Sequence, residues 1–432
     1  MRLKRIIYAA VGAAAAAVMS GCGVITSADS LMSPPKLTEQ QNMIYEALTE
    51  AAGKVRLVYP EGGSHRSAYI MSDFDGDGME EAAVFYRKDS DENSIVRLNM
   101  IDCTDGKWHS VYDCAGAGAA VDSAELISAP DSDRVYIAAG YRLISADDRL
   151  VHIYSYKDSV IETVYSGEYD VCTVTDLTND GTDDVLVISG NTDKASAQVS
   201  LICDSGEGMS CTDSIPLDKN LTGFEAVTAG YIMKDTPALF IDETDPDGNV
   251  STEIIYCVED HLRNPAAVEG STIKADTKRF RGYPCMDIDG DGITEIPVTE
   301  VLPGYENEPE KLYMTDWNVF SDYSIVRKYS GWYSRQGGWC MMFPVRWEGL
   351  VTVKKDNATG AVIFCQSLDR DDTELMRICP VKTEQTDAML KNGWTLIANG
   401  GQTDYLVKLS ENASDNMVLT LTEVQNNFFI AG

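Results

Sequence analysis

The chain has 432 residues and a formal net charge of −33, so it is long enough for one large core or for two ordinary domains. Its acidity excludes a nucleic-acid-binding protein, because contacts to phosphates need a basic stripe and the sequence contains none. The histidines are too far apart in sequence for a local zinc signature; they are His65, His109, His152 and His261.

The first 22 residues predict export and lipid anchoring. A cationic start (residues 1–5) precedes an uncharged apolar run (residues 6–19), which is the order of a secretory signal. That run is shorter than the roughly 20 residues of a spanning helix, so a permanent span is the weaker interpretation. Residues 19–22 resemble a bacterial lipobox, in which Cys22 is acylated and attaches the mature chain to the outer face of the cell membrane. The alternative is an ordinary secretory peptide cleaved near Gly21.

Residues 23–54 are predicted to form a tether followed by one amphipathic helix. Apolar residues recur at helical spacing over residues 37–52. Thr38 and Gln41 have the spacing of a capping box, and Gly53 is placed to end the helix.

From residue 55 to about residue 380 the chain consists of short apolar, β-branched runs separated by turn residues, which is an all-β pattern. Acidic nonamers recur at residues 73–81, 176–184 and 287–295, and strand pairs without such a loop lie between them. We therefore expect units of roughly 50 residues. Six or seven four-stranded units of this kind predict a β-propeller. Residues 381–432 have a mixed pattern and either close the propeller or extend from it.

The three nonamers have the composition of a calcium-binding loop. Oxygens at positions 1, 3, 5 and 9, with a backbone carbonyl at position 7, can converge on one hard cation. Glycine or asparagine at positions 4 and 6 tolerates the positive φ of such a tight turn. The middle loop has Thr178 in place of an acid, so we expect weaker binding there. The expected Ca²⁺ ligands are Asp73, Asp75, Asp77, Met79 and Glu81; Asp176, Thr178, Asp180, Thr182 and Asp184; and Asp287, Asp289, Asp291, Ile293 and Glu295.

These loops lie between strands, which separates them from the helix-flanked loops of EF-hands and dockerins. They resemble the FG-GAP or VCBS repeats of integrin α-subunit heads and of related bacterial surface propellers. The chain departs from that pattern because alternate units lack the loop. The resemblance implies calcium as a structural staple on one face, with partners bound elsewhere, and it implies no catalytic activity.

Ten cysteines remain besides Cys22. Export permits disulfides, and two pairs close in sequence, Cys103 with Cys114 and Cys203 with Cys211, could close small hairpins. Several cysteines lie inside apolar runs, so buried free thiols are an equal alternative.

The sequence contains no nucleophile elbow, phosphate-binding loop or dinucleotide fingerprint. An aromatic-rich stretch offers faces that suit sugars or peptides, although packing between blades explains it as well. Its candidate ligand-binding residues are Trp317, Trp332, Tyr333, Arg335 and Trp339.

Taken together, these features favour a cell-surface lipoprotein whose calcium-stabilised propeller is a non-catalytic module for binding an extracellular protein or glycan. Two alternatives stay open. One is an extracellular carbohydrate-active enzyme that uses the aromatic stretch, and the other is a scaffold for assembling envelope proteins.

Overall fold

The computed structural model describes residues 37–89, 95–129, 134–143, 148–190, 197–206, 208–218, 220–367, 373–411 and 416–431. Cys22 and the export signal lie outside these residues. Within the described part of the chain, no helix has the length and apolarity needed to cross a membrane.

The N-terminal helix forms as the sequence predicts. Helix α3 (Glu39–Ala52) begins at Thr38, whose hydroxyl and main chain form a reciprocal capping box with Gln41. It ends at Gly53, which has a φ of 80°. The helix buries Ile44, Ala47 and Leu48 and packs against two strands of the first sheet, β4 and β5.

The prediction of an all-β fold is confirmed, because the described residues form six antiparallel sheets of four or five strands. We number the sheets in chain order. The first contains β1 (Val55–Leu57), β2 (Tyr69–Ser72), β3 (Glu81–Lys88), β4 (Arg97–Thr104) and β5 (Lys107–Ala115). The second contains β6 (Ala120–Ala129), β7 (Arg134–Arg142), β8 (Arg149–Lys157) and β9 (Val160–Glu168). The third contains β10 (Val171–Thr175), β11 (Asp184–Ser189), β12 (Gln198–Asp204) and β13 (Met209–Pro216).

The fourth sheet contains β14 (Gly223–Met233), β15 (Thr236–Thr244), β16 (Val250–Val258) and β17 (His261–Arg263), and it is followed by η2 (Pro265–Ala267) and α4 (Ile273–Asp276). The fifth contains β18 (Ile296–Val301), β19 (Tyr313–Ser321), β20 (Ser324–Ser334), β21 (Trp339–Met342) and β27 (Phe428–Ile430). The sixth contains β22 (Val351–Asp356), β23 (Ala361–Gln366), β24 (Thr373–Lys382), β26 (Thr403–Leu409) and β25 (Thr395–Asn399). Short helices flank these strands: η3 (Val345–Trp347), η4 (Thr383–Gln385), α5 (Thr386–Lys391) and α6 (Leu421–Asn426).

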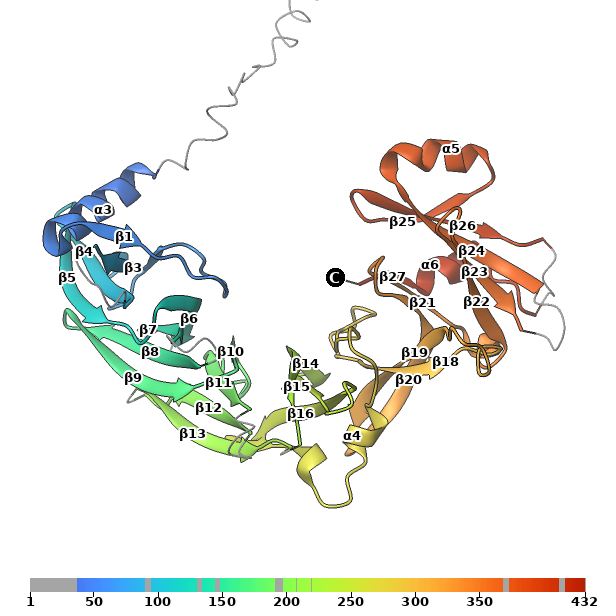
Figure 1. Cartoon of the computed structure of the whole chain (residues 1–432), viewed down its shortest axis with the longest axis horizontal. Coiled ribbons are helices and arrows are strands. Elements are labelled where there is room, and N and C mark those ends of the chain that lie inside the picture. Colours follow the sequence, from blue (N-terminus) through green and yellow to red (C-terminus); the bar gives the residue numbers. More distant parts are fainter. Residues whose placement is uncertain are drawn as a thin grey trace, which may run out of the picture.

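The sheets follow one another along an arc in the manner of propeller blades, with the first sheet and α3 at one end and the sixth sheet at the other (Figure 1). In the described part of the chain, no strand pairs the first sheet with the sixth. The C-terminal segment instead completes the last two sheets. Strands β25 and β26 extend the sixth sheet, and β27 pairs with β21 at the edge of the fifth.

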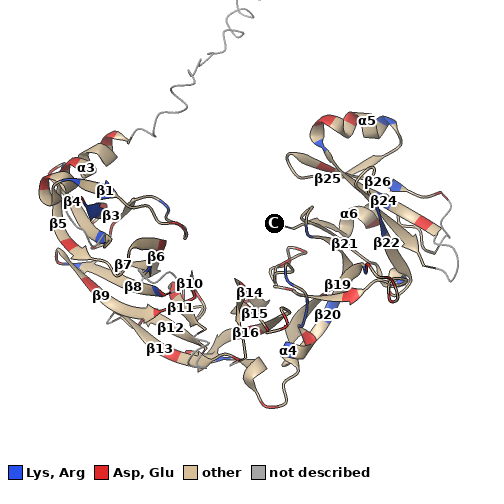
Figure 2. Ribbon diagram, viewed as in Figure 1, with Lys and Arg blue, Asp and Glu red and all other residues tan. Residues whose placement is uncertain are grey.

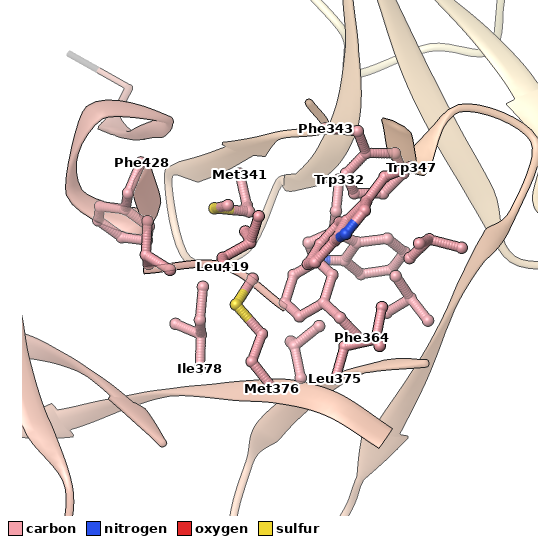
Figure 3. Packing of buried hydrophobic residues seen from close by; sticks show 14 of the residues in the cluster. Trp332, Met341, Phe343, Trp347, Phe364, Leu375, Met376, Ile378, Leu419 and Phe428 are labelled. Carbon is pink, nitrogen blue, oxygen red and sulfur yellow. The ribbon is translucent and has the colours of Figure 1, made fainter. Parts of the chain in front are cut away.

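The largest apolar cluster joins the fifth and sixth sheets. Figure 3 shows Trp332 and Trp347 packed together with Phe343 and Phe364, while Phe428 of β27 lies at the other side of the cluster. Large aromatic side chains bury more apolar area than aliphatic ones, so this stretch contributes strongly to the packing between sheets.

The ten cysteines in the described residues are free thiols. Cys285, Cys340, Cys365 and Cys379 are buried, in keeping with the apolar runs that contain them.

Candidate functional sites: three acidic loops and an aromatic cavity

The three acidic nonamers occupy the same place in their sheets. Each one is a hairpin loop that leads directly into a strand of its sheet, which is β3, β11 or β18, and its ninth residue pairs with the residue that comes just before the loop. These pairs are Ser72 with Glu81, Thr175 with Asp184, and Met286 with Glu295. The alignment made from sequence therefore corresponds to a repeated local structure.

The first residue of each loop fixes the turn by accepting main-chain hydrogen bonds. Asp73 accepts from the N–H groups of Gly76 (2.8 Å) and Gly78 (2.9 Å). Gly76 and Gly78 have φ values of 78° and 87°, a region that residues with a Cβ rarely adopt. In the middle loop Asn179 takes the place of the first glycine with a φ of 59°, so the substitution preserves the turn.

The first loop gathers carboxylates without a basic partner among the described residues. One oxygen from each of Asp73, Asp75, Asp77 and Glu81 lies within 4.8 Å of the others. Glu81 is buried, and it accepts a 2.8 Å hydrogen bond from the N–H of Phe74. Burial, reinforced by the charges of Asp75 and of Asp102 on β4, raises the pKa of Glu81 to about 7.

This first loop fits a hard cation. Two like charges 4 Å apart repel by about 4 kcal/mol at an effective dielectric near 20, and a bound Ca²⁺ would offset that repulsion for Asp73, Asp75, Asp77 and Glu81 together. Calcium also prefers carboxylate oxygens, which this loop supplies.

The third loop has the same four carboxylates, and a lysine already satisfies them. Asp287, Asp289, Asp291 and Glu295 also place one oxygen each within 4.8 Å of the others. The Nζ of Lys328, on β20, lies 2.8 Å from Asp289, 2.6 Å from Asp291 and 2.8 Å from Glu295. An ammonium group thus stands where the sequence predicts a metal ion.

The middle loop offers fewer charges. The hydroxyl of Thr178 donates to Asp184 at 3.0 Å, and Asp184 is buried. Within the described part of the chain, Asp176, Asp180 and Asp184 do not form a group of three carboxylates within 4.8 Å. Cys203 lies beside Asp184, and burial together with that carboxylate raises the pKa of its thiol.

A second site lies at the aromatic stretch, but only part of the predicted set contributes to it. Trp317 and Trp339 are 0% and 1% exposed, so their rings pack in the interior. Tyr333 and Arg335 line a cavity of about 640 Å³, and Trp332, which is 5% exposed and also packs in the core, lies at its wall. The structure adds residues that are distant in sequence: Tyr283, Tyr313, Lys311 and Lys355.

The lining of this cavity is basic and aromatic. Lys311, Arg335 and Lys355 all contribute to it, and no acidic residue and no histidine is among the lining residues. The Arg335 guanidinium lies 4.9 Å from the centre of the Tyr283 ring, and the Lys355 ammonium lies 5.4 Å from that of Trp332. The chain has 68 acidic and 35 basic residues, and acidic positions occur along the whole arc of sheets (Figure 2). A lining with three basic residues and no acidic one departs from that composition.

Sequence reasoning missed Lys328 and the four added cavity residues for one physical reason. They reach their sites through strand pairing or through contacts between distant segments. An alignment of the second and third strands after each nonamer is the signal that would have identified Lys328.

Comparison with solved structures finds weak similarity to enzymes. One is an exotype rhamnogalacturonan lyase, YesX, with 9% identity, a TM-score of 0.31 and coverage of 74% of this chain and 73% of that chain. A putative 6-phosphogluconolactonase from Bacteroides fragilis has 11% identity, a TM-score of 0.28 and coverage of 71% and 84%. The rhamnogalacturonan lyase YesW has 12% identity, a TM-score of 0.30 and coverage of 70% and 60%.

These TM-scores are too low to carry an argument about function. No protein-family model matches the sequence, and no curated protein matches it either. The resemblance to FG-GAP and VCBS propellers therefore rests on the three nonamers and on the sheets that carry them.

Proposed function

We propose that the chain is a lipoprotein, anchored outside the cell membrane through Cys22, whose propeller-like body binds an acidic glycan without catalysing a reaction on it. The observation that carries this proposal is the basic, aromatic cavity beside Trp332 and Arg335. Sugar rings pack on aromatic faces, and guanidinium and ammonium groups form charge-assisted hydrogen bonds with carboxylates. An acidic sugar uses both features, whereas a neutral sugar uses only the first.

The absence of acids from the cavity lining argues against hydrolysis there. Hydrolysis of a glycosidic bond generally needs two carboxyl groups on either side of it, and the residues that line the cavity supply none.

Calorimetric titration of the full chain in detergent tests the proposal, with oligogalacturonate as the acidic ligand and a neutral oligosaccharide of equal length beside it. We expect the acidic ligand to bind. Arg335→Ala and Lys355→Ala should each weaken that binding about tenfold, which is the cost of roughly one charge-assisted contact. Lys54→Ala is the control, because Lys54 is exposed, directly precedes β1 in the first sheet and does not line the cavity.

Equal binding of the two sugars would contradict the role of the cations. Preferential binding of polyglutamate would assign the cavity to acidic protein segments instead. Shortened or unsaturated sugar products in the same incubation would establish the enzyme alternative, and recovery with envelope-complex subunits would favour the scaffold.

We further propose that the first loop binds Ca²⁺ as a structural staple. A ligand that binds only the folded state stabilises it by about 2.7 kcal/mol when its free concentration is one hundred times the dissociation constant. Thermal unfolding in EDTA, followed by calcium titration, should show a saturable rise in Tm. Asp75→Asn should remove most of that rise, and a melt that is independent of calcium in the parent chain would contradict the staple.

A further inference from the structure

The third strand after each acidic loop, which is β5, β13 or β20, contains a β-bulge at the same register. In the fifth sheet, Asn318 on β19 pairs with Arg327, whereas the preceding residue Trp317 pairs with Tyr329. Lys328 therefore has no partner in the ladder. A bulge of this kind leaves one extra residue unpaired and redirects its side chain.

The first and third sheets follow the same path. In the first sheet, Ile101 pairs with Ser110 and Met100 pairs with Tyr112, which leaves Val111 unpaired. In the third sheet the skipped residue is Thr212. The residue after the ninth loop position pairs with a residue on the next strand, and that residue pairs in turn with the one just before the bulge. This register is the same in all three sheets.

The side chain at the bulged position therefore differs in chemistry among the three sheets. Lys328 sends its ammonium to three carboxylates of the third loop. Val111 is apolar and packs against the cluster that contains Phe74 of the first loop. Thr212 directs its hydroxyl to the main-chain oxygen of Leu201.

A second position also differs in charge between the first and fifth sheets. It is the residue that follows Ile101 on β4 and Asn318 on β19. In the first sheet this residue is Asp102. In the fifth sheet the corresponding residue is Val319. The first loop therefore has an additional negative neighbour, whereas the third loop has a positive one.

We infer that Lys328 is the built-in cation of the third loop and takes the place of calcium there, so that the first loop is the chain's principal calcium site. The lysine bridges the loop and strand β20 of the same sheet, as a metal ion would bridge carboxylates within the loop.

The fourth sheet shows that this chain uses the same device elsewhere. Asp218, Glu243 and Glu253 also form a close group of carboxylates. The Nζ of Lys274 lies 2.7 Å from Asp218, 2.6 Å from Glu243 and 3.4 Å from Glu253. Within the described residues, the first loop is the one close carboxylate group of the three that lacks a lysine.

A reciprocal exchange at the bulged position tests the inference, with calcium stoichiometry measured on the full chain by equilibrium dialysis. Lys328→Met should add one bound calcium relative to the parent chain. Val111→Lys should remove one, because it places an ammonium beside the first loop. Terbium luminescence, which reports ion binding directly, gives a second readout for each variant.

Two further variants keep the test decisive if Lys328→Met does not fold. In the parent background, Asp287→Asn should leave the number of bound calcium ions unchanged, whereas Asp75→Asn should lower it by one. Unchanged stoichiometry in folded Lys328→Met, or calcium lost through Asp287→Asn, would overturn the role of Lys328.

This inference rests on the calcium site proposed for the first loop, and the two can fail separately. A gain in Lys328→Met with no calcium bound to the parent chain would support the lysine and refute the first-loop site.

Discussion

At the scale of single residues, His152 shows how burial sets a protonation state in this fold. Its Nδ1 lies 3.0 Å from the hydroxyl of Tyr154, which in turn lies 2.9 Å from the hydroxyl of Tyr141. Burial lowers the pKa of His152, because the charged imidazolium loses its hydration. The folded chain therefore favours the neutral ring more strongly than the unfolded chain does.

We predict that this histidine makes the fold sensitive to mild acid. Below its unfolded pKa of about 6.5 the unfolded chain binds the extra proton more readily, so the free energy of unfolding falls as the pH decreases. His152→Gln cannot titrate and should lose this contribution. Denaturant unfolding of both chains between pH 8 and pH 5 measures it, and parallel pH profiles would contradict the prediction.

At the scale of elements, the acidic loops need glycine because of the backbone conformation and not because a side chain would clash. Gly78 has a φ of 87°, and a Cβ added there would meet no atom within 4 Å. The cost of a side chain at this position is therefore conformational.

Gly78→Ala should lower the free energy of unfolding by about 1–2 kcal/mol, the usual cost of a left-handed backbone in a residue with a Cβ. Gly223→Ala is the matched control, because Gly223 lies in β14 outside the positive-φ region and an added Cβ would make only an ordinary contact of 3.5 Å with Thr244. Denaturant midpoints of the two variants give the comparison. Equal losses would show that the loop does not impose the strain.

Local motifs could be predicted from the sequence, whereas contacts between distant strands could not. The capping box of α3 and the turns of the three nonamers involve residues a few positions apart, so local sequence specifies them. The bulge at Lys328 depends on how three strands pair, and nothing near Asp287 in sequence indicates it. The aromatic stretch was ambiguous for a similar reason. The end of β20 lies at the cavity, which Tyr333 lines, whereas Trp339 on β21 packs in the core.

At the scale of the whole molecule, the C-terminal strand holds the last two sheets together. Phe428 of β27 stacks on Trp339 with ring centres 5.5 Å apart, and it contacts Tyr405 of the sixth sheet at 5.1 Å. The strand therefore links both sheets through one buried ring.

Phe428→Ala should cost about 3–5 kcal/mol, the range for removing a buried phenylalanine ring. Ile430→Ala is the control from the same strand, because Ile430 is 41% exposed. Urea unfolding followed by tryptophan fluorescence measures both variants, because buried tryptophans such as Trp339 become exposed on unfolding. A loss below 1 kcal/mol in Phe428→Ala would mean that β27 contributes little to the fifth sheet.

The position of β27 also dictates an order of events during synthesis. Strand β21 emerges before the whole sixth sheet, yet its edge partner emerges after it. Until then β21 presents unpaired main-chain groups, which is the kind of edge that recruits other strands. The nascent chain consequently exposes an adhesive edge for as long as the sixth sheet takes to appear, and a product that stops short of β27 retains that edge permanently as a target for chaperones and proteases.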